Sequence, residues 1–124
     1  MRILAIDDDP VFLELLAGML KMIGYAQVTT MPSGDEALHE LDFSGMLYDC
    51  ILSDMQMPDM DGAALTAAIR SRTAYRQTPV LMITANYSNE LKQQMRELGH
   101  TLMHKPVRPM KLKTAMSHLL EKGA

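Results

Sequence analysis

The sequence is poor in cysteine, in aromatic residues and in positive charge, and it has no tryptophan. Cys50 is the only cysteine, so no disulfide can form within the chain, and a reducing, cytoplasmic setting is expected. A net charge of -3 with scattered Lys and Arg residues argues against nonspecific binding to nucleic acid. No apolar run is long enough to span a bilayer, and acidic residues come too early for a signal peptide.

The length and composition fit one globular domain. A chain of 124 residues with 48% hydrophobic and 22% charged residues can bury a sizeable core. No linker, internal repeat or low-complexity segment divides the chain, so we expect residues 1–124 to form a single domain without an output domain. The thirteen methionines predict an adaptable core, because methionine fills gaps without fixing one rotamer.

Short apolar runs alternate with segments that have helical spacing. Five runs have the length of strands, and several are apolar on both faces, which is typical of a parallel sheet covered by helices. They are Arg2 to Ile6, Ala26 to Met31, Cys50 to Ser53, Pro79 to Thr84 and Thr101 to His104. A helix is expected after each run, which predicts a doubly wound α/β domain of five β-α units, written (βα)5.

Helix start signals agree with this division. Asp9 before Pro10 predicts a cap followed by a proline in the first turn, and Ser33, Asp61 and Ser88 precede further expected helices. The apolar positions at helical spacing in the first helix are Val11, Leu15, Ala17, Leu20 and Met22. Their spacing predicts a helix over this segment.

Polar residues stand where the predicted strands end. Asp7 and Asp8 follow the first strand, Asp54 follows the third, Thr84 ends the fourth and Lys105 follows the fifth. Open α/β sheets bind ligands beyond the carboxyl ends of their strands, so this edge is the candidate site. If the first and third strands are neighbours, the three aspartates converge although more than forty residues separate them in the chain.

Three carboxylates in one pocket repel one another, and a divalent cation would offset that repulsion. Two unit charges about 4 Å apart repel by roughly 1 kcal/mol in water and about 4 kcal/mol at an effective dielectric of about 20. Magnesium suits the pocket better than zinc or copper, because oxygen ligands are present and cysteine is not. With a phosphate bound, Lys105 could pair with one phosphoryl oxygen and Thr84 could donate to another, which indicates phosphoryl transfer to a carboxylate.

The motifs resemble those of a known family. The segments ILAIDDDP, ILSDMQMPDMDG, PVLMITA and HKP are similar to the successive signatures of the two-component response-regulator receiver domain, over essentially the whole chain. The resemblance implies a flavodoxin-like fold with a five-stranded parallel sheet in the order 2-1-3-4-5. It also implies a phosphorylation-dependent signalling switch that is not an enzyme, apart from Mg2+-dependent phosphorylation and dephosphorylation of itself.

The resemblance assigns roles around the phosphoryl group. It implies that Asp54 accepts this group from a histidine kinase, a histidine phosphotransfer protein or a small donor. Asp8 would bind Mg2+ directly and Asp7 through water, while Asp54 and the backbone carbonyl of Gln56 would complete the metal ligands.

Other residues are implied to respond to the phosphoryl group. Thr84 would be the hydroxyl that moves toward it, and Lys105 would be the cation that pairs with it. The peptide bond from Lys105 to Pro106 is expected to be cis. Gln56 and Asn86 flank the site and are expected to tune hydrolysis of the phosphate.

Two departures from the family pattern stand near the carboxyl end. The segment from Gly99 to Lys105 is one residue shorter than usual. Leu102 falls near the position where many members have an aromatic residue that acts as a rotamer switch coupled to the threonine. The usual threonine-aromatic relay therefore has no ring at this position. The ending HKPVRPMKL resembles receivers attached to hybrid histidine kinases, whereas a methionine just before the first strand fits a free-standing regulator equally well.

Two other functions fit part of the pattern. A small Mg2+-dependent phosphohydrolase would also form an aspartyl phosphate, but such enzymes want a second acid two residues beyond the nucleophile, where this chain has Gln56. A constitutive interaction module would not need the full set of phosphorylation residues that is present. Asp9 is better explained as a helix cap, and Asp59 and Asp61 as turn residues, than as metal ligands.

The expected output is a change in protein binding. Phosphate on Asp54 adds charge at the strand ends, and the face formed by the fourth helix, fifth strand and fifth helix is expected to shift between two packings. The partners would be a histidine kinase or phosphotransfer protein and a downstream protein on that face. Direct binding to nucleic acid and insertion into a membrane are not expected.

Overall fold

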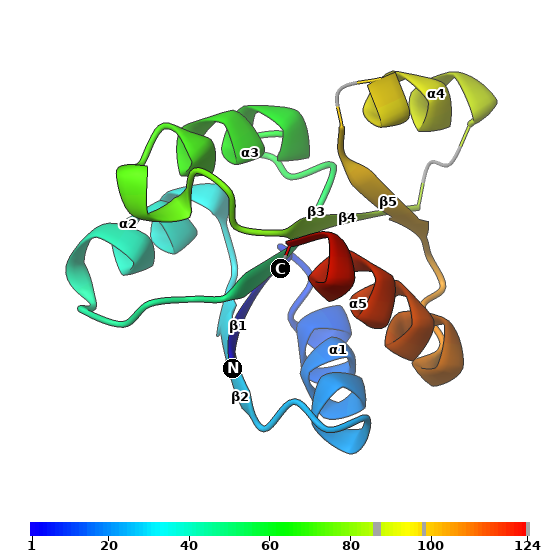
Figure 1. Ribbon diagram of the computed structural model, residues 1–124, viewed down its shortest axis with the longest axis horizontal. Coiled ribbons are helices and arrows are strands. Elements are labelled where there is room, and N and C mark those ends of the chain that lie inside the picture. The colour runs from blue at the N-terminus through cyan, green and yellow to red at the C-terminus, as the bar shows by residue number, and fades with distance from the viewer. Residues whose placement is uncertain (86–87, 98, 124) are drawn as a thin grey trace.

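The computed structural model describes residues 1–85, 88–97 and 99–123 (Figure 1). Within these ranges, five strands form one parallel sheet in the order β2-β1-β3-β4-β5. The strands are β1 (Arg2–Ile6), β2 (Gln27–Met31), β3 (Cys50–Asp54), β4 (Val80–Thr84) and β5 (Thr101–His104). The expected strand order is confirmed, and each predicted strand boundary lies within one residue of the observed one.

Helices connect the strands and cover both faces of the sheet. They are α1 (Pro10–Met22), α2 (Gly34–Phe43), α3 (Gly62–Arg70), α4 (Asn89–Glu97) and α5 (Pro109–Gly123), with a short 3-10 helix η1 (Thr73–Tyr75) before β4. Helices α1 and α5 lie on one face, and α2, α3 and α4 lie on the other (Figure 1). This is the predicted doubly wound (βα)5 arrangement. Among the described residues, no helix has the length and apolarity that a membrane span requires.

The helix starts are set by side chains next to them in the sequence. Asp9, Ser33 and Asp61 precede α1, α2 and α3, and each accepts a hydrogen bond from a backbone N–H of the first turn. Ser88 does the same for α4, where its hydroxyl oxygen accepts from the N–H of Leu91 at 3.1 Å. These bonds satisfy donors that a helix cannot pair internally. Local sequence therefore determines where each of these helices begins.

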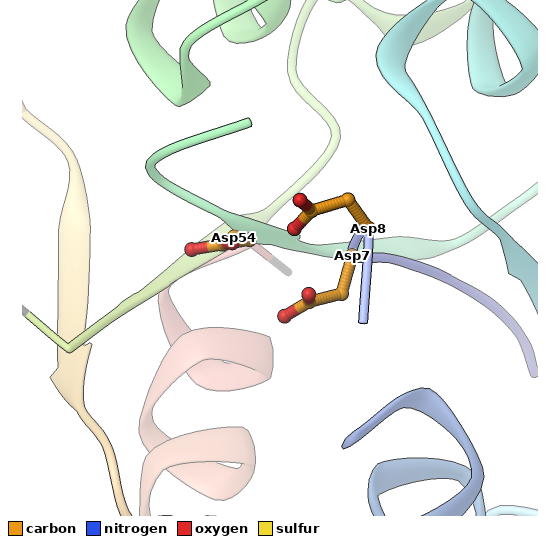
Figure 2. Close-up of side chains that lie close together, drawn as sticks. All are labelled: Asp7, Asp8 and Asp54. Atoms are coloured by element: carbon orange, nitrogen blue, oxygen red, sulfur yellow. The ribbon is translucent and has the colours of Figure 1, made fainter. Parts of the chain in front are cut away.

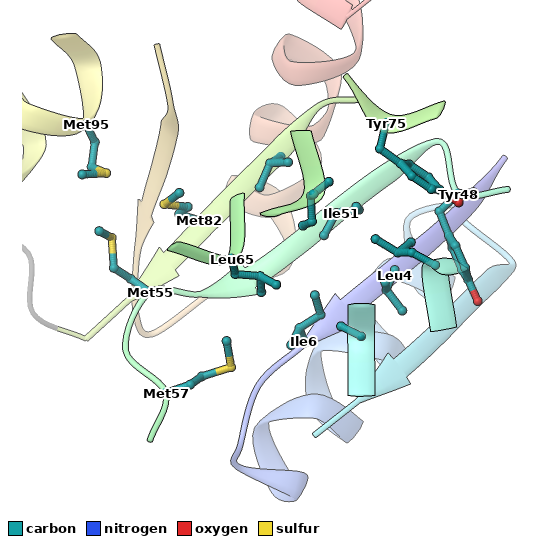
Figure 3. Packing of buried hydrophobic residues seen from close by; sticks show 14 residues of the cluster. Leu4, Ile6, Tyr48, Ile51, Met55, Met57, Leu65, Tyr75, Met82 and Met95 are labelled. Carbon is teal, nitrogen blue, oxygen red and sulfur yellow. Dashed lines mark hydrogen bonds between the residues drawn. The ribbon is translucent and has the colours of Figure 1, made fainter. Parts of the chain in front are cut away.

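Two buried clusters hold the helices against the sheet. Every residue of β3 and β4 is buried, and successive residues such as Ile51 and Leu52 point into opposite clusters. Figure 3 shows the cluster beneath α2, α3 and α4, in which Leu4 and Ile51 lie near Leu65 of α3. Fully burying one such side chain contributes about 1.5–3 kcal/mol. The core thus fixes the strands whose ends carry the polar residues.

The predicted helix α1 is confirmed, but most of the apolar positions that indicated it do not face the core. Val11, Leu15 and Met22 are exposed, with 65%, 60% and 68% of their surface accessible, and of the five positions only Leu20 is buried. The buried residues of α1 are Leu13, Leu16 and Leu20. The helix PVFLELLAGMLKM is apolar almost all round, so its spacing offers two competing apolar stripes. Packing against the sheet selects one of them.

Candidate functional site

The candidate site lies at the carboxyl edge of the sheet, where β1 and β3 end side by side. These strands pair in parallel, with Ile6 opposite Ser53. Asp7 follows Ile6 and Asp54 follows Ser53, so the register itself places two acidic residues at neighbouring positions. A carboxylate at each strand end would be costly without a partner, because buried charges need pairing or a metal.

Asp7, Asp8 and Asp54 form one cluster at this edge (Figure 2). Each offers one carboxylate oxygen, and these three atoms all lie within 4.8 Å of one another. Asp7 and Asp54 are buried, whereas Asp8 is exposed to solvent. Three oxygen donors at this spacing, without sulfur or imidazole, fit a hard divalent cation such as Mg2+. The donor set therefore agrees with the expected metal.

Lys105 reaches the cluster from the segment that follows β5. Its Nζ donates to Asp7 Oδ2 at 3.0 Å and lies 3.9 Å from Asp54 Oδ2. Its backbone N–H donates to the carbonyl oxygen of Thr84 at 2.8 Å, which joins this segment to the end of β4. The peptide bond from Lys105 to Pro106 is cis, as expected. One ammonium thus faces two of the three carboxylates.

The surroundings of Asp54 oppose its ionised form. Burial raises the pKa of its carboxyl, and the charges of Asp7 and Asp8 also raise it. The backbone N–H of Gln56, which donates to Asp54 Oδ1 at 3.2 Å, and the Lys105 ammonium lower this pKa in part. The net pKa lies above the ordinary value of 3.8. A cation bound among these carboxylates would relieve the repulsion that contributes to this shift.

Thr84 and Gln56 lie beside the cluster. Asp54 is opposite Ile83 in the sheet, so Thr84 is one residue beyond that pair, and its side chain is fully buried. The side chain of Gln56 is exposed, two residues after Asp54. Asn86, which was also expected near the site, lies outside the described residues.

The other acidic residues near the site have structural partners. Asp9 caps α1, and its backbone N–H donates to Asp7 Oδ1 at 2.9 Å. Asp61 caps α3. Asp59 Oδ2 accepts from the N–H of Asp35 at 3.1 Å and so joins the loop before α3 to the start of α2. The interpretation of Asp59 as a turn residue missed this contact, because its partner is 24 positions away in the chain.

Phe12 is a neighbour of the site that no sequence motif indicated. The Nζ of Lys105 lies 4.2 Å from the centroid of the Phe12 ring. The sequence places Phe12 near the acidic residues, since it stands in the first turn of the helix that begins directly after them, but it gives no sign that Lys105 lies over the ring. The aromatic ring and the carboxylates therefore contact the same ammonium.

Known proteins resemble this chain over nearly its whole length. The family model of the response regulator receiver domain matches residues 3–117. The two-component response regulator ARR11 of Arabidopsis thaliana is 35% identical over 125 residues, which cover 98% of this chain and 23% of that protein. The sensor histidine kinase RcsC of Salmonella typhi is 38% identical over 123 residues, which cover 98% of this chain and 12% of that protein.

A solved structure extends the likeness to three dimensions. The chemotaxis protein CheY4 of Vibrio cholerae superposes with a TM-score of 0.84 at 33% identity, over 95% of this chain and 97% of that one. Nearly its whole length therefore matches this chain. By contrast, the chain spans less than a quarter of the length of the Arabidopsis and Salmonella proteins.

Proposed function

Because this chain belongs to the response regulator receiver domain family, we propose that it is a signalling switch in which Asp54 is the phosphoacceptor. Receiver domains of two-component systems are phosphoacceptors in signalling and are generally not enzymes for an external substrate. The match over residues 3–117 supports one receiver domain over residues 1–124.

The position of Asp54 between the acidic pair and the ammonium carries this proposal. Its Oδ2 lies 3.9 Å from the Nζ of Lys105, while its Oδ1 accepts a backbone hydrogen bond. A carboxylate oxygen of Asp54 attacks phosphorus, a new oxygen-phosphorus bond forms, and the bond to the donor's leaving group breaks with its electron pair. The Lys105 ammonium offsets negative charge on the transferred group, so positioning and charge carry most of the catalysis.

The carboxylates of Asp7, Asp8 and Asp54, with the backbone carbonyl of Gln56, are the proposed ligands of Mg2+. The 4.8 Å spacing of the three carboxylate oxygens supports the first three of these assignments. When bound, the metal supplies positive charge that neutralises the phosphoryl oxygens. Asp8, the exposed member of the cluster, would bind the metal directly, whereas Asp7, whose Oδ2 already accepts from Lys105, would act through water.

Phosphorylation is proposed to act on the face formed by α4, β5 and α5. Thr84 ends β4, its carbonyl oxygen accepts from the Lys105 N–H, and Lys105 follows β5, so a shift of either residue toward a phosphoryl group moves this edge. Leu102 of β5 is partly buried and packs against the cluster that includes Met95 of α4. An aliphatic side chain thus stands where an aromatic switch is usual, and the coupling to α4 would go through this packing.

The proposed partners follow from two steps, phosphorylation of Asp54 and the change in protein binding that results. A histidine kinase or histidine phosphotransfer protein would donate the phosphoryl group, and a downstream protein would bind the face of α4, β5 and α5. The likeness to the receiver portions of a response regulator and of a sensor kinase supports a place in such a phosphorelay.

Phosphorylation by a small donor tests the proposed function. The protein incubated with acetyl phosphate and Mg2+ should gain one phosphoryl group by intact mass, and Asp54→Asn should gain none. Asp35→Asn, an exposed acid at the start of α2, should be phosphorylated like the unmodified protein. Label that persists in Asp54→Asn would contradict the assignment, and sustained hydrolysis of unrelated phosphomonoesters would indicate a phosphohydrolase instead.

A further inference from the structure

We infer that Phe12 is a positioning residue for Lys105, an inference that rests on the proposed function of this site. The ammonium lies over the aromatic ring, with 4.2 Å between Nζ and the ring centroid. The ring is therefore placed to restrict where the charge of Lys105 can go.

The ring itself is held in place by its own helix. Phe12 belongs to the first turn of α1, and its backbone N–H donates to the capping carboxylate of Asp9 at 3.3 Å. Its side chain is partly buried and packs against the cluster beneath α1 and α5. Because the acidic pair leads directly into this capped turn, two of the proposed metal ligands, Asp7 and Asp8, and the ring belong to the same short segment.

The ammonium has three neighbours with different chemistry. Asp7 accepts a hydrogen bond at 3.0 Å, Asp54 lies 3.9 Å away, and the Phe12 ring covers another side. An aromatic face attracts a cation through its quadrupole. A carboxylate in the same place would compete as a strong acceptor, whereas the ring leaves an N–H of Lys105 available to a phosphoryl oxygen.

Restricting Lys105 should matter because its side chain is long and flexible. A free lysine side chain has many rotamers, and ordering it costs free energy at the moment a phosphoryl group arrives. Packing against a fixed ring removes part of this freedom beforehand, while 21% of the Lys105 side chain remains accessible. Phe12 therefore affects the rate of phosphoryl transfer to Asp54 through Lys105, without touching the reacting atoms.

Phe12→Leu, Phe12→Tyr and Phe12→Trp separate the aromatic face from apolar bulk. We expect Phe12→Leu to lower the rate of phosphorylation by acetyl phosphate at saturating Mg2+ by about 2- to 10-fold. Phe12→Tyr and Phe12→Trp keep a ring and should keep most of the rate. A small donor is used so that contacts of α1 with a protein donor cannot contribute. Urea unfolding midpoints of all variants would show that they fold.

Leu15→Ala is the matched control on the same surface. Leu15 lines the groove that Phe12, Lys105, Pro106 and Val107 also line, but its side chain is aliphatic and exposed. This variant should be phosphorylated at the unmodified rate.

A second readout follows the contact without any phosphate. In protein with isotope-labelled lysine, the ring should shift the Lys105 ε-methylene proton signals upfield, and Phe12→Leu should abolish this shift. A Phe12→Leu rate equal to that of the unmodified protein, or an equal slowing in Leu15→Ala, would overturn the positioning role alone. If the unmodified protein is not phosphorylated on Asp54, the proposed function fails, and the positioning role fails with it.

Discussion

Asp54 illustrates how the neighbours of one carboxyl set its chemistry. The residue is buried at a strand end, lies among two other carboxylates and faces one ammonium at 3.9 Å. Burial and like charges raise its pKa above 3.8, so the folded protein binds this proton more tightly than the unfolded chain. The ionised form that a nucleophile needs is therefore obtained at a cost in stability.

Because the ionised form of Asp54 destabilises the folded protein, Asp54→Asn should stabilise it. Raising the pH above 3.8 deprotonates the unfolded chain first, so stability falls with rising pH until the folded carboxyl also ionises. Removing the charge should increase the free energy of unfolding at pH 7, without divalent cations, by about 1 kcal/mol. The gain should shrink as the pH falls toward 3.8. Urea unfolding at several pH values measures it, and a gain that grows on acidification would contradict this account.

Removing the ammonium of Lys105 should lower the free energy of unfolding, whereas removing the charge of Asp54 should raise it. Its ammonium is the donor to buried Asp7 and a neighbour of Asp54, so Lys105→Met leaves both carboxylates without it. Leaving a buried carboxylate without its cation costs about 3–5 kcal/mol in a fully buried pair, and less is expected here because the lysine is partly accessible. We expect a loss of about 1–3 kcal/mol in urea unfolding at pH 7. Asp54→Asn added to Lys105→Met should restore part of that loss.

At the scale of elements, the close approach of β3 and α3 depends on one glycine. A Cβ added to Gly62 would lie 2.9 Å from the Cα of Met55 and 3.3 Å from the carbonyl oxygen of Asp54. The N–H of Gly62 also donates to the carbonyl oxygen of Met55 at 2.7 Å. The start of α3 is therefore packed directly against the backbone that carries the proposed phosphoacceptor.

Gly62→Ala and Gly18→Ala should change stability in opposite directions. The first substitution forces two backbone segments apart and should lower the free energy of unfolding by about 1–3 kcal/mol. Gly18 lies inside α1 with no heavy atom within 4 Å of an added Cβ, so alanine there should raise it by about 0.5–1 kcal/mol. Urea unfolding compares the two, and equal effects would show that the contact with Met55 is unimportant.

The sequence predicted elements better than it predicted their contacts. Capping residues such as Asp9 and the short apolar runs are local signals, so the element starts and the sheet could be predicted. The side of α1 that faces the sheet could not be predicted, because both sides of this helix are apolar. The exposed Val11 and Leu15 looked as suitable for burial as the buried Leu13 and Leu16. Convergence of polar residues at strand ends follows from a parallel sheet once its order is known.

Contacts between distant segments gave no such local signal. The Phe12 ring and the Lys105 ammonium meet only because α1 and the segment after β5 pack on the same side of the sheet. The contact of Asp59 with the start of α2 has the same character. Cys50 was correctly expected to be a small buried residue, since it lies within an apolar run, and burial raises the pKa of its thiol to about 12.

For the whole molecule, cation binding and folding should be linked. The three carboxylates come together only when β1 and β3 are paired, so an unfolded chain does not offer this cluster. Mg2+ at about 100 times its dissociation constant should raise the free energy of unfolding by about 2.7 kcal/mol, and a chelator should reverse the effect.

The linkage can be assigned to the cluster with Asp8→Asn. This change removes the exposed carboxylate and should greatly weaken the stabilisation by Mg2+ in thermal unfolding. Asp35→Asn, which lies outside the cluster, should leave it intact. Sodium chloride at matched ionic strength controls for screening, and equal stabilisation of all three proteins would mean that Mg2+ acts elsewhere.

The hydrogen bond from Lys105 to Asp7 joins residues 98 positions apart, so it closes a loop that includes most of the polypeptide. A ribosome-bound chain that has not yet released β5 would already hold all three acids but would lack their counter-charge. Reactivity toward a donor would then arise only after synthesis of the last β-α unit. Chemical competence at this edge would thus report that this domain has been synthesised through Lys105 and has assembled its sheet.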